Sequence, residues 1–334
     1  MKKYYYLFNP GRVSRKDNTF KFEGFNVEGK AQKPKYLPIE GIEGLYVFGS
    51  IDANSKMYNF FGKQRIPVHF FDYYEHYTGS FMPKEYLLAG KVQILQTQFY
   101  SSNKKRIVLA RKFIEAAVHN MRQVLKYYDS RGKNVKAQIA KIEVYQEGIS
   151  KVKYINELMG LEGNVRQVYY SAFNAVLNNF EMNGRNRQPP RDPVNALISF
   201  GNMVCYTSCL DQIYHTQLNP TISFLHEPGA RRYSLSLDLA EIFKPLLVDR
   251  TIFSLLNKRI IQEKDFDTSL NKCLLSESGR KKFMKAYDER LKQTIMHRSL
   301  NKKVSYKRLV KLECYKLLKH LLEIEDYQGL KLWW

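Results

Sequence analysis

The spacing of hydrophobic residues changes near residue 85 of this 334-residue chain. Before that point apolar residues alternate with polar ones, as in Thr19–Phe25, where phenylalanine alternates with lysine and glutamate. A period of two is typical of a β-strand with one buried face. The stretches with this period, or rich in aromatic and β-branched residues, are Tyr4–Phe8, Thr19–Phe25, Gly44–Gly49 and Ile66–Phe71. We expect strands there and one short helix, at Ala53–Phe61.

From Lys84 onward apolar residues recur at intervals of three and four, which is the spacing of one face of an α-helix. The helices expected from this spacing are Glu85–Tyr100, Lys104–Tyr128, Val135–Tyr145, Val152–Leu158, a long helix from Leu161 after a turn at Met159-Gly160, Pro193–Leu210, a helix from Ser236, Lys281–His297 and Tyr306–Ile324. We therefore expect an α+β protein, with a small β-rich domain at residues 1–85 and a larger all-α domain at residues 86–334.

The net charge of the chain indicates which class of molecule it binds. Apolar residues make up 44% of the chain, as in a globular protein, while 54 Lys and Arg stand against 32 Asp and Glu, a net charge of +22. Such a balance favours a polyanion as partner, and for DNA it predicts binding that weakens steeply with salt. The positive residues that cluster on two expected helices and on loops are Lys104, Lys105, Arg106, Arg111, Lys112, Arg122, Lys302, Lys303, Lys307, Arg308, Lys311, Arg185, Arg187, Arg191, Arg231 and Arg232. Each cluster alone also fits a solvated helix face.

Membrane and secretory roles are not indicated. No run approaches the about 18 to 20 apolar residues that span a bilayer, and Asn9-Pro10-Gly11 interrupts the short apolar run at the N-terminus. The four cysteines form no CxxC pair, which favours free thiols in a reducing, cytoplasmic setting rather than a disulfide or zinc site.

Candidate chemistry is most concentrated in the stretch from His226 to Arg250. Asp238 and Glu241 are three residues apart and share one face of an expected helix, and His226 precedes them beside a Pro-Gly turn. One histidine with carboxylates suits Mg²⁺ or Mn²⁺ better than zinc. A histidine paired with a carboxylate inside a helical core fits the same pattern, and the spacing does not choose between these readings.

Glu162 is the best candidate for a further carboxylate, because it lies on the face of its helix that carries Val165 and Tyr169. A buried carboxylate needs a partner. That partner is either Arg166, four residues later, or a metal ion. No GxGxxG, P-loop, GxSxG or HExxH motif is present.

Three segments together resemble one family. They are LEGNVRQVYYSAFN at 161–174, RQPPRDPVNALISFGN at 187–202 and LHEPGARRYSLSLDLAEIFKPLLVDR at 225–250. In order and spacing, and in the β-rich front before a helical body, the chain resembles the CRISPR-associated spacer-acquisition integrase, the DNA endonuclease/integrase subunit of the CRISPR adaptation complex.

The resemblance implies a set of site residues. Glu162, His226 and Glu241 would ligate a catalytic Mg²⁺ or Mn²⁺, and Asp238 would support them. Arg231 and Arg232 would meet DNA phosphate. Asn195 and Asn202 lie in the family's helix NALxSFGN, where a supporting role is expected.

The resemblance also implies an activity and partners. The metal would bind the scissile phosphate, and the 3′-hydroxyl of a captured DNA fragment would attack a CRISPR repeat boundary by transesterification; branched DNA would be excised in reverse. The protein would form a homodimer through its β-rich domain, and two such dimers would bracket a dimer of a small ferredoxin-like partner in a heterohexamer. The alternatives are a structure-specific nuclease without an integration role and a non-catalytic nucleic-acid-binding scaffold.

Overall fold

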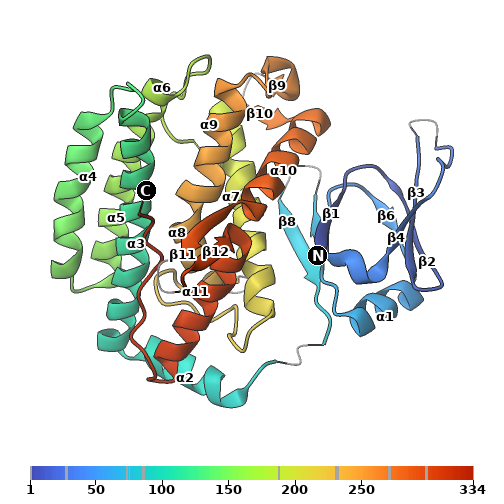
Figure 1. Cartoon of the computed structure of the whole chain (residues 1–334), viewed down its shortest axis with the longest axis horizontal. Helices are drawn as coiled ribbons and strands as arrows, with labels where there is room; N and C mark the ends of the chain where they lie inside the picture. The colour runs from blue at the N-terminus through green and yellow to red at the C-terminus, as the bar shows by residue number, and fades with distance from the viewer. Residues whose placement is uncertain are drawn as a thin grey trace. The chain divides into compact units, whose positions relative to one another are not determined.

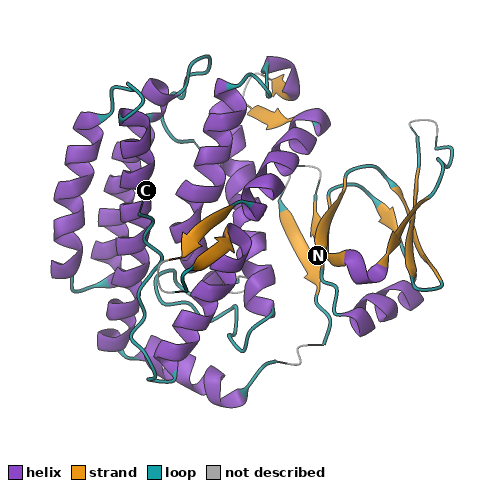
Figure 2. Cartoon of the chain, in the orientation of Figure 1, coloured by secondary structure: helices purple, strands orange, loops and turns teal. Residues whose placement is uncertain are grey.

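The computed structural model describes residues 2–26, 29–72, 74, 76–84, 87–186, 189–229, 233–269, 272–297 and 300–333. The chain divides into two compact units, Met1–Tyr86 and Leu87–Trp334. The first is built mainly of strands and the second mainly of helices (Figure 2). The expected α+β class is therefore confirmed.

The first unit contains two four-stranded sheets and a helix. One sheet has the order β1-β5-β7-β8, with parallel pairs except between β7 and β8, and the other has the order β4-β3-β2-β6. The bounds are β1 Lys3–Leu7, β2 Gly11–Lys16, β3 Thr19–Gly24, β4 Lys35–Pro38, β5 Ile42–Val47, β6 Ile51–Asp52, α1 Ser55–Gln64, β7 Val68–Phe71 and β8 Tyr77–Phe81, with a 3₁₀ turn at Ile39–Gly41. The four predicted strands correspond to β1, β3, β5 and β7. The other four are short or polar and lack a clear period of two.

The core of this unit lies where both sheets and α1 meet. Phe20 from β3, Leu45 from β5 and Phe61 from α1 are all buried in one apolar cluster. Asn54 caps α1, because its side chain accepts a hydrogen bond from the backbone N–H of Met57 at 3.1 Å. The helix follows the predicted one, with its start two residues later.

The second unit is a bundle of helices with two short hairpins (Figure 1). The bounds are α2 Gly90–Ser101, α3 Asn103–Asp129, α4 Lys136–Gly148, α5 Ile155–Ser171, α6 Phe173–Val176, α7 Pro193–Tyr214, α8 Ser234–Lys244, α9 Arg250–Asn257, β9 Phe266–Ser269, β10 Lys272–Leu275, α10 Glu277–Lys292, β11 Thr294–His297, β12 Lys302–Ser305 and α11 Tyr306–Leu321, with 3₁₀ turns at Ile149–Lys151 and Glu263–Asp265 and a π-helical segment at Pro245–Asp249.

Helix α8 lies at the centre of the bundle, between α3 and α7 (Figure 1). Nearly all of its residues are buried, including the polar ones Asp238, Glu241 and Lys244. Pro245 follows directly and cannot donate a backbone hydrogen bond, and the chain continues as the π-helical segment into α9. A helix buried on all sides cannot solvate its polar groups, so each of them needs a partner inside the protein.

Three expectations for the helical unit were wrong in detail. No turn interrupts the chain at Met159-Gly160, since α5 runs from Ile155 to Ser171. A glycine in a helix costs only about 1 kcal/mol, and the buried face of Leu158, Val165 and Tyr169 offsets that loss. The expected helix Lys281–His297 ends at Lys292, before β11, and the two hairpins were not predicted in a domain expected to be all helical.

Gly201 in α7 permits a close approach to the π-helical segment. A Cβ atom at this position would lie 2.4 Å from Cγ1 of Val248 and 2.8 Å from Cζ of Phe283. These distances are too short for a methyl group, so only glycine fits without displacement of the neighbours. The π-helical segment is thereby held directly against α7.

The C-terminal residues pack along α3. The side chain of Asn120 donates to the backbone oxygens of Ile242 at 3.1 Å and Leu330 at 2.9 Å. It also accepts from the backbone N–H of Leu332 at 3.0 Å. One buried amide on α3 therefore joins the tail to α8.

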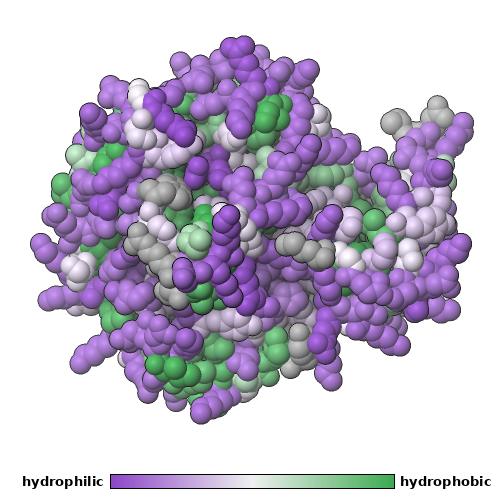
Figure 3. Space-filling model, viewed as in Figure 1, coloured by the Kyte–Doolittle hydropathy of each residue, from purple (hydrophilic) through white to green (hydrophobic). Residues whose placement is uncertain are grey.

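The visible face of the helical unit carries mainly hydrophilic side chains with scattered apolar ones (Figure 3). None of the helices formed by the described residues has the length and apolar character needed to cross a membrane.

Candidate metal centre

Three ionisable side chains of α8 follow one another along the same helix face. Asp238, Glu241 and Lys244 are spaced three residues apart, which brings successive side chains onto one side of the helix. Asp238 is completely buried, and Glu241 is only 4% exposed. The site is formed around the side chains on this face of α8.

Asp238 fixes the loop that carries the histidine. Its Oδ2 accepts the backbone N–H groups of Phe224 at 2.7 Å and Leu225 at 2.9 Å. Its Oδ1 accepts the backbone N–H of His226 at 2.9 Å and is 2.8 Å from the ring Nδ1 of the same residue. A carboxylate with four hydrogen-bond contacts compensates well for its burial.

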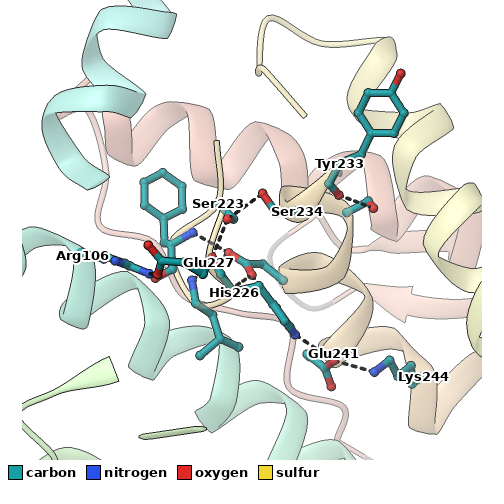
Figure 4. Close-up of polar contacts among 12 residues, drawn as sticks. Arg106, Ser223, His226, Glu227, Tyr233, Ser234, Glu241 and Lys244 are labelled. Carbon is teal, nitrogen blue, oxygen red and sulfur yellow. Dashed lines mark hydrogen bonds and ion pairs between the residues drawn. The ribbon is translucent and has the colours of Figure 1, made fainter. Parts of the chain in front are cut away.

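The same loop is held from α2 and α3. Gln96 bonds Asn219 through both ends of its amide, at 2.8 and 3.1 Å, and also donates to the backbone oxygen of Ile222 at 3.2 Å. Arg106 donates to the backbone oxygen of Phe224 at 2.8 Å and to Glu227 at 2.7 Å (Figure 4). The loop around the histidine is therefore fixed by contacts from three helices.

The orientation of the His226 ring follows from these contacts. Because Asp238 is a hydrogen-bond acceptor, the proton of a neutral ring is assigned to Nδ1 and the lone pair to Nε2. Nε2 points toward Glu241, with 3.9 Å between it and Oε1 (Figure 4). A metal-binding histidine commonly has this arrangement, in which a carboxylate holds one ring nitrogen and the other faces the ligand site.

Arg166 joins the two glutamates. Its Nε donates to Glu162, one turn earlier on α5, and its Nη2 donates to Glu241 on α8. Lys244 donates to the other oxygen of Glu241 at 2.5 Å. Burial tends to raise the pKa of Glu162, but the positive charges of Arg166 and Lys244 outweigh it and hold that pKa below its usual value. The ionised form of Glu162 is thus favoured.

The side chains are of the types that bind a divalent cation. In this structure they form an ion-pair network. Among the residues that the structure describes, no three His, Cys, Asp or Glu side chains gather closely enough to hold a metal ion. The positive charges of Arg166 and Lys244 lie where the glutamates would otherwise repel each other. Two carboxylates and an imidazole nitrogen that faces one of them are nevertheless the donor set that Mg²⁺ or Mn²⁺ accepts.

Four of the predicted site residues meet at this place, from α5, the loop and α8. Glu162 has the ion-pair partner that the sequence suggested, Arg166, and His226 has the carboxylate partner, Asp238. Arg231 and Arg232, predicted to meet DNA, lie outside the described residues.

The two asparagines of α7 differ in their contacts. Asn195 binds the loop before α7, accepting from Arg185 at 2.8 Å and donating to the backbone oxygen of Gly184 at 2.8 Å. It therefore orders that loop. The Oδ1 atom of Asn202 is buried and accepts no hydrogen bond from the described residues.

Sequence patterns missed several residues of the site. Lys244 was identifiable, since it lies three residues after Glu241 on an expected helix. Gln96, Arg106 and Asp249 gave no local signal, because their partners are far away in the chain or become close only through the π-helical segment.

Some of the positive residues that were expected to bind a polyanion form contacts within the protein instead. Arg106 pairs with Glu227, Arg111 donates to the backbone oxygen of Val152 at 2.8 Å, and Arg122 lies 3.5 Å from Glu143. Positive residues of α3 thus hold the bundle together.

Comparison with known proteins identifies relatives along the whole chain. Residues 5–289 match the family described as "CRISPR associated protein Cas1". The chain is 47% identical over 335 aligned residues, 99% of both sequences, to "CRISPR-associated endonuclease Cas1" of Clostridium perfringens (strain SM101 / Type A).

Solved structures have the same fold. A CAS1 protein from Thermotoga maritima is 37% identical with a TM-score of 0.87, covering 98% of this chain and 99% of that one. A casposase bound to an integration product has a TM-score of 0.87 at 20% identity, covering 98% of this chain and 93% of the casposase. At that identity the second likeness concerns the fold alone.

Proposed function

We propose, because the chain belongs to the Cas1 family of CRISPR-associated proteins, that Glu162, His226 and Glu241 bind a divalent cation and that this site joins captured DNA to a CRISPR array. The chain is a CRISPR-associated DNA endonuclease that serves CRISPR adaptation. The metal requirement and the joining reaction are the parts that we add.

One observation carries the proposal. Asp238 binds Nδ1 of His226 while Nε2 faces Glu241, which itself is joined to Glu162 through Arg166. A core ion pair needs only one such partner. Here His226 faces one carboxylate, a second carboxylate is linked to that one through Arg166, and a buried acid fixes the orientation of the imidazole.

A bound Mg²⁺ or Mn²⁺ would supply positive charge to a phosphate oxygen as the attacking and leaving oxygens exchange. Asp238 would keep the proton on Nδ1 of His226, so that Nε2 stays available as a ligand. Glu162 and Glu241 would contribute negative charge that selects a doubly charged ion. In the metal-free protein, Arg166 and Lys244 limit the repulsion between them.

No protein nucleophile is needed in this reaction. The attacking group would be the 3′-hydroxyl of a DNA end, and the bond to the leaving DNA strand would break as the new phosphodiester forms. Tyr169 is completely buried and Tyr170 is partly buried beside it. Neither tyrosine is therefore required as a nucleophile.

The partners of the reaction are DNA and a second protein. The net charge of +22 suits double-stranded and branched DNA. We further propose a homodimer formed through the β-rich unit and a heterohexamer with a small ferredoxin-like CRISPR adaptation protein, as the family resemblance implies.

Two substitutions test the proposal in a joining assay. The protein, its partner protein, a repeat-bearing plasmid and short duplexes are incubated with Mn²⁺, and covalent joining is measured. Glu162→Ala and His226→Ala are expected to abolish joining and to leave DNA affinity within about threefold of the wild type. Matched controls are Glu157→Ala, an exposed acid of the same helix, and His76→Ala, an exposed histidine of the first unit.

The assay also separates the alternatives. Cleavage without joining would support a nuclease without an integration role. Normal DNA binding with neither reaction in the wild type would support a non-catalytic scaffold. Loss of folding in both variants would indicate that the glutamate and histidine serve only the core.

A further inference from the structure

A further buried acid, Asp249, interacts electrostatically with Arg166. Asp249, the last residue of the π-helical segment, is 1% exposed, and neither of its oxygens accepts an ordinary hydrogen bond from the described residues. Burial raises the pKa of this carboxyl to about 6, and the charge of Arg166 and the nearby hydroxyl of Tyr169 lower it in part. A buried carboxylate without hydrogen bonds is costly and calls for an explanation.

Arg166 has a matching unused donor. Its Nε and Nη2 serve Glu162 and Glu241, while Nη1 is buried and has no hydrogen-bond partner among the described residues. The hydroxyl of Tyr169, three residues later on α5, is likewise buried without one. Three polar groups that interact electrostatically, the Asp249 carboxyl, the Tyr169 hydroxyl and Nη1 of Arg166, are thus all left without full hydrogen bonding.

Two other cations that act on Asp249, Lys244 and Arg185, are already engaged. Lys244 donates to Glu241, and Arg185 donates to Asn195 at 2.8 Å and Ser199 at 3.2 Å. Arg166 is the neighbouring cation whose present acceptors are the two proposed metal ligands. When a divalent cation binds these glutamates, the guanidinium loses its acceptors and is repelled by the added charge.

We propose that Asp249 is a positioning residue that receives Arg166, so that the guanidinium moves from the Glu162–Glu241 pair to Asp249 when the divalent cation binds. This inference rests on the proposed metal site. It assigns a role to the π-helical segment, which carries a carboxylate that interacts with the arginine. It also explains why Asp249 remains unsatisfied while Arg166 is on the glutamates.

The proposal makes metal affinity depend on Asp249 only through Arg166. Without Asp249, the displaced guanidinium has no acceptor and competes with the ion. Asp249→Asn is therefore expected to weaken Mn²⁺ binding about tenfold, a ratio that corresponds to about 1.4 kcal/mol. In an Arg166→Gln background no guanidinium competes, so Asp249→Asn is expected to change the affinity less than twofold.

The experiment is a double-mutant cycle on the full chain without DNA. Mn²⁺ affinity is measured by calorimetry for the wild type, Asp249→Asn, Arg166→Gln and the double variant, after circular dichroism confirms folding. Equal weakening in both backgrounds, or no weakening beside Arg166, would overturn the proposal. Should Asp249→Asn fail to fold, Tyr169→Phe removes the neighbouring hydroxyl and is expected to weaken binding about threefold, again only beside Arg166.

The design separates this inference from the proposed function. If Mn²⁺ binds the wild type no more tightly than it binds Glu162→Ala, the metal site itself is absent and both proposals are wrong. If binding requires Glu162 but is insensitive to Asp249, only the role of Asp249 is wrong.

Discussion

Asp238 binds His226 at two points, through the backbone N–H at 2.9 Å and the ring Nδ1 at 2.8 Å. One buried acid therefore sets both the position of the residue and the rotation of its ring. Its second oxygen binds the two preceding backbone amides, so the loop and the side chain cannot be positioned independently of each other.

Asp238→Asn should damage both the fold and the metal site. All four contacts of this carboxylate are to N–H groups, so an amide nitrogen must face at least one donor. We expect a loss of about 2 to 4 kcal/mol in unfolding free energy and about 10- to 100-fold weaker Mn²⁺ binding, measured by urea denaturation and calorimetry.

Glu313→Gln is a matched control for this substitution. Glu313 is also buried and accepts from Tyr327 at 2.8 Å and from the backbone N–H of Leu330 at 3.1 Å. This variant should lose stability without a change in Mn²⁺ affinity. An equal loss of affinity in both variants would show that Asp238 acts only through global stability.

The stability of the Lys244→Met variant should depend more strongly on bound metal than that of the wild type. Glu241 would lose one of its two cationic partners, which destabilises the metal-free protein by about 1 to 3 kcal/mol. Removal of a positive charge beside the site should also tighten Mn²⁺ binding several-fold. Unfolding is measured in EDTA and in Mn²⁺, and the deficit should shrink when the ion is present.

The exposed ion pair of Lys319 with Glu325 provides the comparison for Lys244. Lys319→Met should change unfolding free energy by less than about 1 kcal/mol in either buffer. A deficit in Lys244→Met that is identical with and without Mn²⁺ would contradict the prediction.

Gly201→Ala should destabilise the helical unit by about 1 to 3 kcal/mol, because the added methyl group would overlap Val248 and Phe283. Gly160→Ala should do the opposite. Gly160 is exposed within α5, and a Cβ atom there meets nothing within 4 Å. A gain of about 0.5 to 1 kcal/mol is expected there. Thermal denaturation measures the change in stability of both variants. A Gly201→Ala variant more stable than the wild type would contradict the close packing.

Titration of the Asp249 carboxyl should lower the unfolding free energy of the protein as the pH rises. The pKa of its carboxyl is about 6 in the folded protein and 3.8 as the ordinary value. Between these values the native state holds a proton that the unfolded state has released. The unfolding free energy therefore decreases with rising pH across this window, by about 3 kcal/mol in all.

Asn does not titrate, so the unfolding free energy of Asp249→Asn relative to the wild type should grow by about 2 kcal/mol from pH 4 to pH 7 in EDTA. Asp265 is a control whose effect on stability should have the opposite pH dependence. Burial tends to raise its pKa, but its bonds to Lys282, Gln262 and Ser278 lower it overall. The deficit of Asp265→Asn should shrink as the pH falls. A pH-independent difference for Asp249→Asn would contradict the raised pKa.

The sequence was most informative where partners are close in the chain. The spacing of Asp238 and Glu241 predicted their shared helix face, and that of Glu162 and Arg166 offered their ion pair as one of two alternatives. Both follow from helix geometry alone. The shift from a period of two to helical spacing likewise predicted the α+β architecture.

Longer-range features were not accessible in the same way. The contact of Arg166 with Glu241 joins residues 75 positions apart, and that of Gln96 with Asn219 joins residues 123 apart. Local patterns carry no information about such pairs. The family resemblance, rather than spacing, brought Glu162 and His226 together. The continuous helix through Gly160 shows tertiary burial overriding local propensity.

The contacts of Asn120 have a consequence for how the protein is synthesised. Helix α8, which carries Glu241, is tied through Ile242 and Asn120 to Leu330 and Leu332. A nascent chain still covered by the ribosome at residue 332 cannot form these bonds. The bonds from Asn120 to the tail therefore form only once residues 330 to 332 have left the ribosome, so a shorter nascent chain lacks this link between the tail and α8.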